Sequence, residues 1–123
     1  MPSQQDVSSF IAATFRSVWA LELLCFLRQD RGRSLSHAEM VAGLRGSDLV
    51  VSQSVDSLTA AGLVIAEVDG SARYCPASDD LDALVEAAAA LYARSPDAVR
   101  RTIVAAANPA ITAFAAAFRL RKD

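Results

Sequence analysis

The sequence predicts a mainly helical protein with one small β-hairpin. Apolar residues recur at helical spacing over most of the chain, and serine and proline start signals separate the helical stretches. In addition, Asp69-Gly70 lies between two short runs of strand-forming residues. With 123 residues and 53% hydrophobic content, we expect one globular domain spanning residues 1–123.

The first segment, residues 1–31, is helical. An apolar stripe begins at Val7 and repeats at helical spacing, and Asp6 is the expected cap. Residues 19–27 are apolar in nearly every direction, so this part must be covered on more than one side. The pattern leaves open whether the segment is one bent helix or two helices broken near Ser17.

The central segment, residues 33–77, begins with two short helices. Ser36 followed by Glu39 forms a capping box that starts the first helix. Gly46 fits the left-handed residue that closes it, and Ser47 with Asp48 supplies a new cap and a first-turn acid. The second helix therefore begins almost where the first one stops.

This second helix is expected over about residues 48–61, with Val51, Val55 and Leu58 on its core side. Residues 63–68 are rich in strand formers, and Asp69-Gly70 is a hairpin turn signal. Residues 73–75 are then expected to form the returning strand. Together these features predict a hairpin over about residues 63–76.

A helix, a tight turn, a second helix and a hairpin in this order resemble the winged helix-turn-helix of MarR-like and PadR-like transcription regulators. The stretch VSQSVDSLTAAGLV is similar to their recognition-helix segment, and the resemblance covers about residues 17–76. It implies a winged helix-turn-helix flanked by N- and C-terminal helices, with residues 33–35 as a third strand beside the wing. In this family the second helix enters the major groove and the wing contacts the DNA backbone or minor groove.

The last segment, residues 78–123, is predicted to hold three alanine-rich helices. They start at Ser78, at Ser95-Pro96 and at Asn108-Pro109, because each is a cap or a cap followed by proline. Asp79, Asp80 and Asp82 are first-turn acids of the first of these helices. The terminal helices carry more apolar stripes than one small core needs, so we expect a homodimer that pairs through them. The alternative is that they cover only their own domain.

The resemblance implies a function in transcription regulation, with double-stranded DNA as the partner. It assigns base and phosphate contacts to polar side chains of the second helix and to arginines around it. The implied DNA-binding residues are Ser47, Ser52, Gln53, Ser54, Ser57, Arg31, Arg33, Arg45 and Arg73.

The charge of the second helix departs from this pattern. It contains Asp48 and Asp56 but no arginine or lysine, and the whole chain has a net charge of −2. Since phosphate contacts supply much of the affinity for DNA, the arginines at the edges would have to offset this repulsion. The alternative function is therefore a winged-helix module that binds another protein and not DNA.

The sequence predicts no enzyme, metal site or cofactor. His37 has no ligand partner at metal spacing, and we expect a surface or partly buried first-turn residue. Cys25 and Cys75 are expected to be buried thiols of a cytoplasmic protein, because no signal peptide or membrane-length apolar run is present.

Overall fold

The computed structural model describes residues 2–107. The helices are α1 (Gln4–Thr14), α2 (Val18–Gln29), α3 (His37–Leu44), α4 (Asp48–Ala60), α5 (Asp79–Arg94) and α6 (Pro96–Ala107), and the strands are β1 (Val64–Ala66) and β2 (Ala72–Tyr74). The fold is therefore mainly helical with a small antiparallel hairpin, as predicted at this level. The third predicted C-terminal helix, from Asn108, lies outside the described residues.

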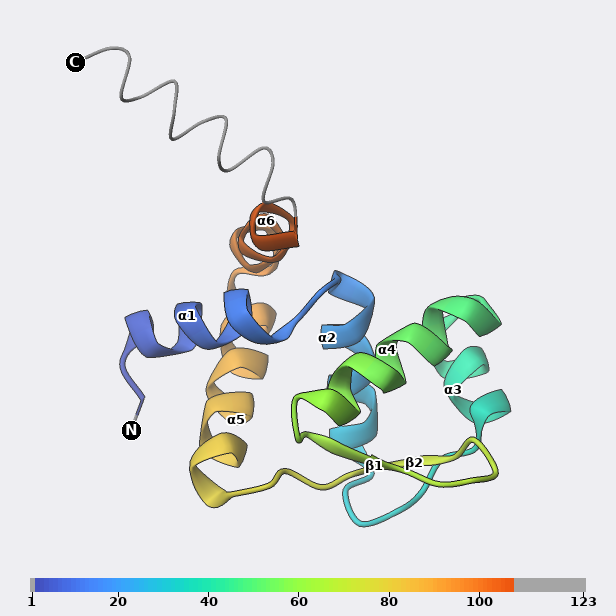
Figure 1. The fold of residues 1–123 in the computed structure, drawn as a ribbon. Helices are drawn as coiled ribbons and strands as arrows, with labels where there is room; N and C mark the ends of the chain where they lie inside the picture. Colours follow the sequence, from blue (N-terminus) through green and yellow to red (C-terminus); the bar gives the residue numbers. More distant parts are fainter. Residues whose placement is uncertain (1, 108–123) are drawn as a thin grey trace, which may run out of the picture.

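Helix α2 lies at the centre of the molecule. Figure 1 shows α3, α4 and the hairpin on one side of it and α1, α5 and α6 on the other. Five residues of α2 are buried, among them Leu23, Leu24 and Leu27 with no exposed surface. This double covering explains why its sequence is apolar in nearly every direction.

The first segment consists of two separate helices, α1 and α2, and not of one bent helix, a choice that the sequence left open. The two helices meet at 110°, and Ser17 caps α2 by accepting a hydrogen bond from the Ala20 N–H at 3.2 Å.

Among the described residues, no single helix has the length and apolar character to cross a membrane; only α1 and α2 taken together across their bend do.

The α1 cap was predicted one turn too late. Ser3 is the cap: its hydroxyl accepts from the Asp6 N–H, and the Asp6 carboxylate accepts from the Ser3 N–H at 3.2 Å. Asp6 is thus the acidic partner in a capping box and not the cap itself.

The α3–α4 turn confirms one prediction and corrects another. Ser36 and Glu39 form the predicted capping box, and Ser47 caps α4. The left-handed residue is Arg45, with φ of 57°, and not Gly46. The helix ends one residue earlier than glycine placement suggested, so arginine adopts a conformation that glycine usually takes.

The hairpin pairs Val64 with Tyr74 and Ala66 with Ala72. Gly70 has φ of +90°, and its N–H donates to the Glu67 carbonyl, so Asp69-Gly70 lies in the hairpin turn as predicted. The implied third strand at residues 33–35 is reduced to a bridge between Leu35 and Ala72, with both N–H···O distances 2.9 Å. It is short because the α3 cap follows at once.

Candidate nucleic-acid interface

Helix α4 has one buried side and one exposed side. Val51 and Leu58 have no exposed surface, and Val55 is 8% exposed. Ser52, Gln53 and Asp56 lie on the opposite side and are exposed. The helix therefore presents a polar face to the surroundings, and this face carries part of the site that the sequence predicted.

Two of the predicted serines do not lie on that face. Ser54 is only 3% exposed, and the Ser57 hydroxyl is buried without a hydrogen-bond partner among the described residues. Positions 51, 54, 55 and 58 share one side of a helix, so Ser54 belongs to the core side. The Ser54 and Ser57 hydroxyls are therefore less accessible than the sequence suggested, and their assignment to DNA contact stays a prediction. Ser47 is exposed, but its hydroxyl accepts the Val50 N–H at 3.1 Å.

Two of the four predicted arginines are already paired with acids. Arg31 donates to Asp82 at 3.1 Å, and its guanidinium lies 5.2 Å from the centre of the Tyr74 ring. The Tyr74 hydroxyl also donates to Asp82, at 2.6 Å. This hydrogen bond, with the Arg31 guanidinium, holds the pKa of Asp82 below its usual value.

Arg33 donates to Glu39 at 3.0 Å and lies 3.8 Å from Asp30. The pKa of Glu39 is lowered first by its hydrogen bond with the Ser36 backbone and then by Arg33. Arg31 and Arg33 therefore bring less free positive charge to the surface than the sequence suggested.

Arg45 and Arg73 are the other two of the four arginines that were predicted to contact DNA. Arg45 is exposed in the turn before α4, and Arg73 is half-buried on β2. Within residues 2–107, no carboxylate oxygen lies within 4 Å of either guanidinium. Of the four predicted arginines, these two are therefore the ones whose charge is not offset by a neighbouring acid within the described residues.

The acids of α4 are not equivalent. The His37 Nε2 lies 3.0 Å from Asp48, so a protonated His37 offsets part of that charge. Asp56 has no ion pair within the described part of the chain and points to the surroundings. As expected, His37 is a partly buried residue of the first α3 turn.

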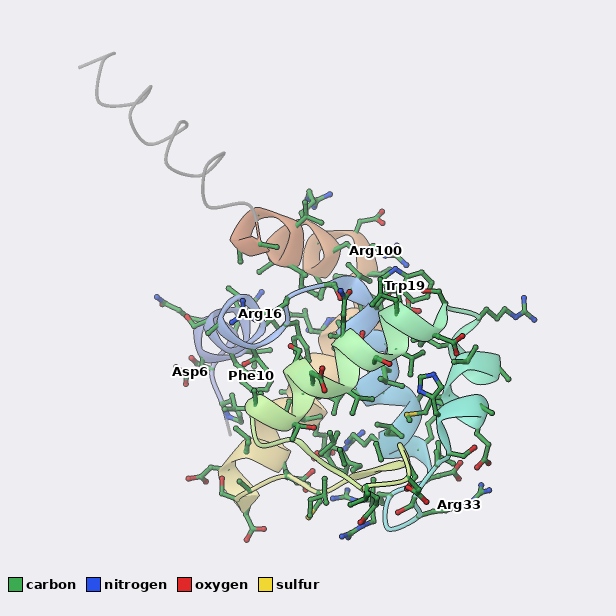
Figure 2. All side chains as sticks on the ribbon, turned by 45° about the vertical axis from the view of Figure 1, so that its right-hand side comes forward. Asp6, Phe10, Arg16, Trp19, Arg33 and Arg100 are labelled. Carbon is green, nitrogen blue, oxygen red and sulfur yellow. The ribbon has the colours of Figure 1, made fainter. Side chains whose placement is uncertain are left out.

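A pocket of about 290 Å³ borders α4. It is lined by Arg16, Ser17, Trp19 and Ala20 at the start of α2 and by Val50, Gln53, Ser54 and Ser57 of α4. Figure 2 labels Arg16 and Trp19 along the upper side of α4. Sequence reasoning did not connect Arg16 with α4, because their proximity depends on the bend at Ser17; the serine cap was the available signal.

Expectations from the sequence also covered the two thiols and the first-turn acids of α5. Cys25 and Cys75 are free and half-buried, and burial raises the pKa of the Cys25 thiol. Asp79, Asp80 and Asp82 do lie in the first turn of α5, but Asp82 also accepts the Tyr74 and Arg31 hydrogen bonds. In the part of the chain that the structure describes, no group of three or more His, Cys, Asp or Glu side chains could hold a metal ion.

Comparisons with protein-family models, with curated proteins and with solved structures each gave no match to this chain.

Proposed function

We propose that this protein is a winged helix-turn-helix regulator that binds double-stranded DNA, with α4 as recognition helix and the β1–β2 hairpin as wing. Its support is the order of elements α2, Leu35 bridge, α3, α4, β1 and β2, with Leu35 and β1 on either side of β2. That arrangement has the helix order and strand pairing of the winged helix-turn-helix.

One observation carries the DNA-binding proposal. Ser52 and Gln53 are exposed on α4, and along the chain they follow Arg45, in the turn before the helix, and precede Arg73, on the hairpin after it. A glutamine amide can pair with adenine in the major groove, while arginines contact phosphates. Asp48 and Asp56 oppose binding, so the affinity depends strongly on these two arginines.

Fluorescence anisotropy with labelled genomic duplexes, including the gene's own upstream region, tests the proposal. Arg45→Ala and Arg73→Ala are each expected to weaken binding and to reduce its salt dependence, because each removes a phosphate contact. Arg101→Ala, an exposed arginine on α6, is the control and leaves binding unchanged. Equal binding by all four proteins would refute the role of these arginines.

We also propose that the regulator acts as a homodimer through its terminal helices. A groove of about 730 Å³ runs between α1 and α5, with Phe10 and Leu84 among its apolar residues. A second copy would cover it, as expected for a two-fold interface. Light scattering over a hundredfold range of concentration is the test, and Phe10→Asp should shift the protein towards monomer.

A specific feature favours a second candidate, a protein-interaction module. Leu49 is 65% exposed on α4, which also carries Asp48 and Asp56, and Val68 is fully exposed at the hairpin tip between Glu67 and Asp69. Exposed apolar side chains with acids suit a protein partner better than a duplex. On this alternative, the protein shows no duplex binding even at low salt, and Leu49→Asp abolishes capture of its partner.

We propose no catalytic role for the chain and no cofactor. The free thiols Cys25 and Cys75 fit a reducing compartment, and we propose the cytoplasm as its location.

A further inference from the structure

The hairpin has one paired edge and one outer edge. On the β2 side, the Ala72 N–H donates to the Leu35 carbonyl and the Leu35 N–H donates to the Ala72 carbonyl, both at 2.9 Å. Strand β2 therefore lies between Leu35 and β1, and β1 is the outer strand. Figure 1 shows the hairpin at the periphery of the molecule, at the end opposite α6.

The register shows which backbone groups of β1 point outward. At the start of the ladder, the Cys75 N–H donates to the Leu63 carbonyl at 3.0 Å. Hydrogen-bonded and non-hydrogen-bonded pairs alternate along an antiparallel ladder, so Ile65 also exchanges hydrogen bonds with β2. The N–H and C=O groups of Val64 and Ala66, which lie between these pairs, therefore point away from β2.

These outward groups have no partner in the described part of the chain. Within residues 2–107, no hydrogen bond joins the backbone N–H or C=O of Val64 or Ala66 to another residue. The ladder also continues past β1, because the Glu67 N–H donates to the Ser71 carbonyl at 2.8 Å. A row of unpaired amide groups at two-residue spacing is the surface to which an extended chain can add as a further strand.

This edge lacks the usual protection against such pairing. Edge strands are commonly protected by lysine, by proline or by a bulge. Residues 63–67 contain no lysine or proline, and the pairing of β1 with β2 has no bulge. Ile65 is 40% exposed and Ala66 is exposed, so the edge offers apolar surface beside its free amides.

The charge along the edge selects the kind of strand. Glu67 is exposed, and no lysine or arginine nitrogen within the described range lies within 4 Å of its carboxylate. Asp69 follows in the turn, whereas Arg73 is on β2, across β1 from an added strand. Ile65 and Glu67 share one face of β1, because side chains alternate along a strand. Their best cross-strand neighbours are an apolar residue and a basic residue two positions apart.

We propose that the outer edge of β1 binds an extended segment of another protein as an added antiparallel strand. The segment places an apolar side chain beside Ile65 and a lysine or arginine beside Glu67. Main-chain hydrogen bonds to Val64 and Ala66 supply affinity, and the two side-chain pairs supply selectivity. Because this surface belongs to the hairpin, its occupation requires no duplex on α4.

A peptide titration of the full chain, followed by amide NMR, is the first test. The probe is the acetylated and amidated heptapeptide Thr-Lys-Thr-Val-Thr-Lys-Thr, whose valine pairs with Ile65 and whose lysine pairs with Glu67. We expect saturable shifts of the Val64 and Ala66 amide signals, because both N–H groups gain an acceptor. No saturable shift of these signals at millimolar peptide would overturn the proposal.

N-methylated peptides test the backbone pairing. In the antiparallel pairing, the two threonines next to the valine direct their N–H groups at β1, and the valine directs its own away. N-methylation of both threonines should weaken binding by about tenfold or more, whereas N-methylation of the valine alone is the control and leaves binding unchanged. Equal weakening by both modifications would contradict the proposed register.

A proline substitution tests the edge in the protein itself. Ala66→Pro removes an outward N–H that has no partner within the described residues, and proline is tolerated at such edge positions. The variant should keep the NOE contacts between Val64 and Tyr74 but lose peptide binding. Ala66→Val retains the N–H and should bind like wild type. Wild-type affinity in Ala66→Pro would place the peptide elsewhere.

A charge exchange tests the selectivity. Glu67→Lys should weaken binding of the lysine peptide by about threefold or more at low salt, because like charges then face each other. The same variant should bind a peptide with glutamate in place of both lysines more tightly than wild type does. If Glu67→Lys leaves the preference between the two peptides unchanged, the assigned basic partner is wrong.

Discussion

The two halves of the molecule on either side of α2 are held together differently. On one side, α3, α4 and the hairpin contribute large side chains with no exposed surface, such as Met40, Leu58 and Leu63. On the other side, α1 and its C-cap bury Ile11 and Phe15, whereas α5 and α6 bury fewer and smaller residues, chiefly Val85, Ala88, Val99 and Ile103. The first half is held together mainly by apolar burial, with the exposed His37–Asp48 contact between α3 and α4 beside it.

The second half adds two tyrosine contacts. Tyr74 of β2 donates to Asp82 of α5 at 2.6 Å, and Tyr92 of α5 donates to Glu22 of α2 at 2.7 Å. Arg100 of α6 also donates to the Tyr92 oxygen and lies over its ring. Burial and then the hydrogen bond to the carboxylate raise the pKa of each tyrosine. The difference teaches that small residues let helices approach closely, while directional polar contacts fix their position.

The largest expected effect comes from the apolar half. Leu58→Ala should lower the free energy of unfolding by about 2–5 kcal/mol, because it removes a fully buried side chain and leaves a cavity. Urea unfolding measures it. Leu49→Ala on the same helix is the control: this side chain is 65% exposed, and its loss should cost within about 0.5 kcal/mol. Similar costs for both would contradict the assigned faces of α4.

Next in size is the contact between the hairpin and α5. Tyr74→Phe should cost about 1.5–3 kcal/mol, because it deletes a hydrogen bond to a carboxylate from a side chain that is 3% exposed. Tyr92→Phe deletes a similar bond at a half-buried site and should cost less, about 0.5–1.5 kcal/mol. A larger loss of unfolding free energy in Tyr92→Phe than in Tyr74→Phe would contradict this ranking of the two tyrosine contacts.

The close approach of α2 and α3 gives a smaller effect. A β-carbon at Gly43 would lie 2.2 Å from the end of the Phe26 ring, so Gly43→Ala forces the ring to move. Alanine favours the helix more than glycine does, and this gain offsets part of the clash. We therefore expect the free energy of unfolding, measured by heat or urea, to fall by about 1–2 kcal/mol. Gly46→Ala meets no atom closer than 3.6 Å and serves as the matched control. A Gly43→Ala protein as stable as wild type would show that Phe26 moves freely.

The smallest effect is on pH dependence. Asp82 has a lowered pKa in the folded protein because Tyr74 and then Arg31 stabilise its charged form. A group of this kind stabilises the fold above its unfolded pKa of about 4, and the contribution is lost as pH falls through the folded value. The free energy of unfolding should therefore decrease below about pH 4.

Asp82→Asn should make that decrease shallower without removing it, because Glu39 and Asp69 also have lowered pKa values through Ser36 and Ser71. Hydrogen exchange at low pH should rise in α5 before it rises in α4. An identical acid response in wild type and Asp82→Asn would show that the Tyr74–Asp82 contact does not couple to stability.

Local signals in the sequence were enough to place most elements. The serine caps at positions 36, 47 and 78 and the Asp69-Gly70 turn all lie where they were expected, because a cap or a turn depends on a few neighbouring residues. The errors at Asp6 and Gly46 are also local: the motif was recognised, but its residue was misplaced by a short distance.

The candidate site depended on contacts that sequence spacing does not reveal. The helical period alone put Ser54 on the core side, and this was a signal that could have been used. In contrast, the pairing of Arg31 with Asp82 joins residues far apart in the chain, and the position of Arg16 beside α4 follows from the 110° bend at Ser17. The sequence by itself determined the helices, their caps and the hairpin, because backbone hydrogen bonding and apolar period are local properties. Only the tertiary structure decided which charges remain unpaired and where a pocket forms, because both depend on how separate elements pack.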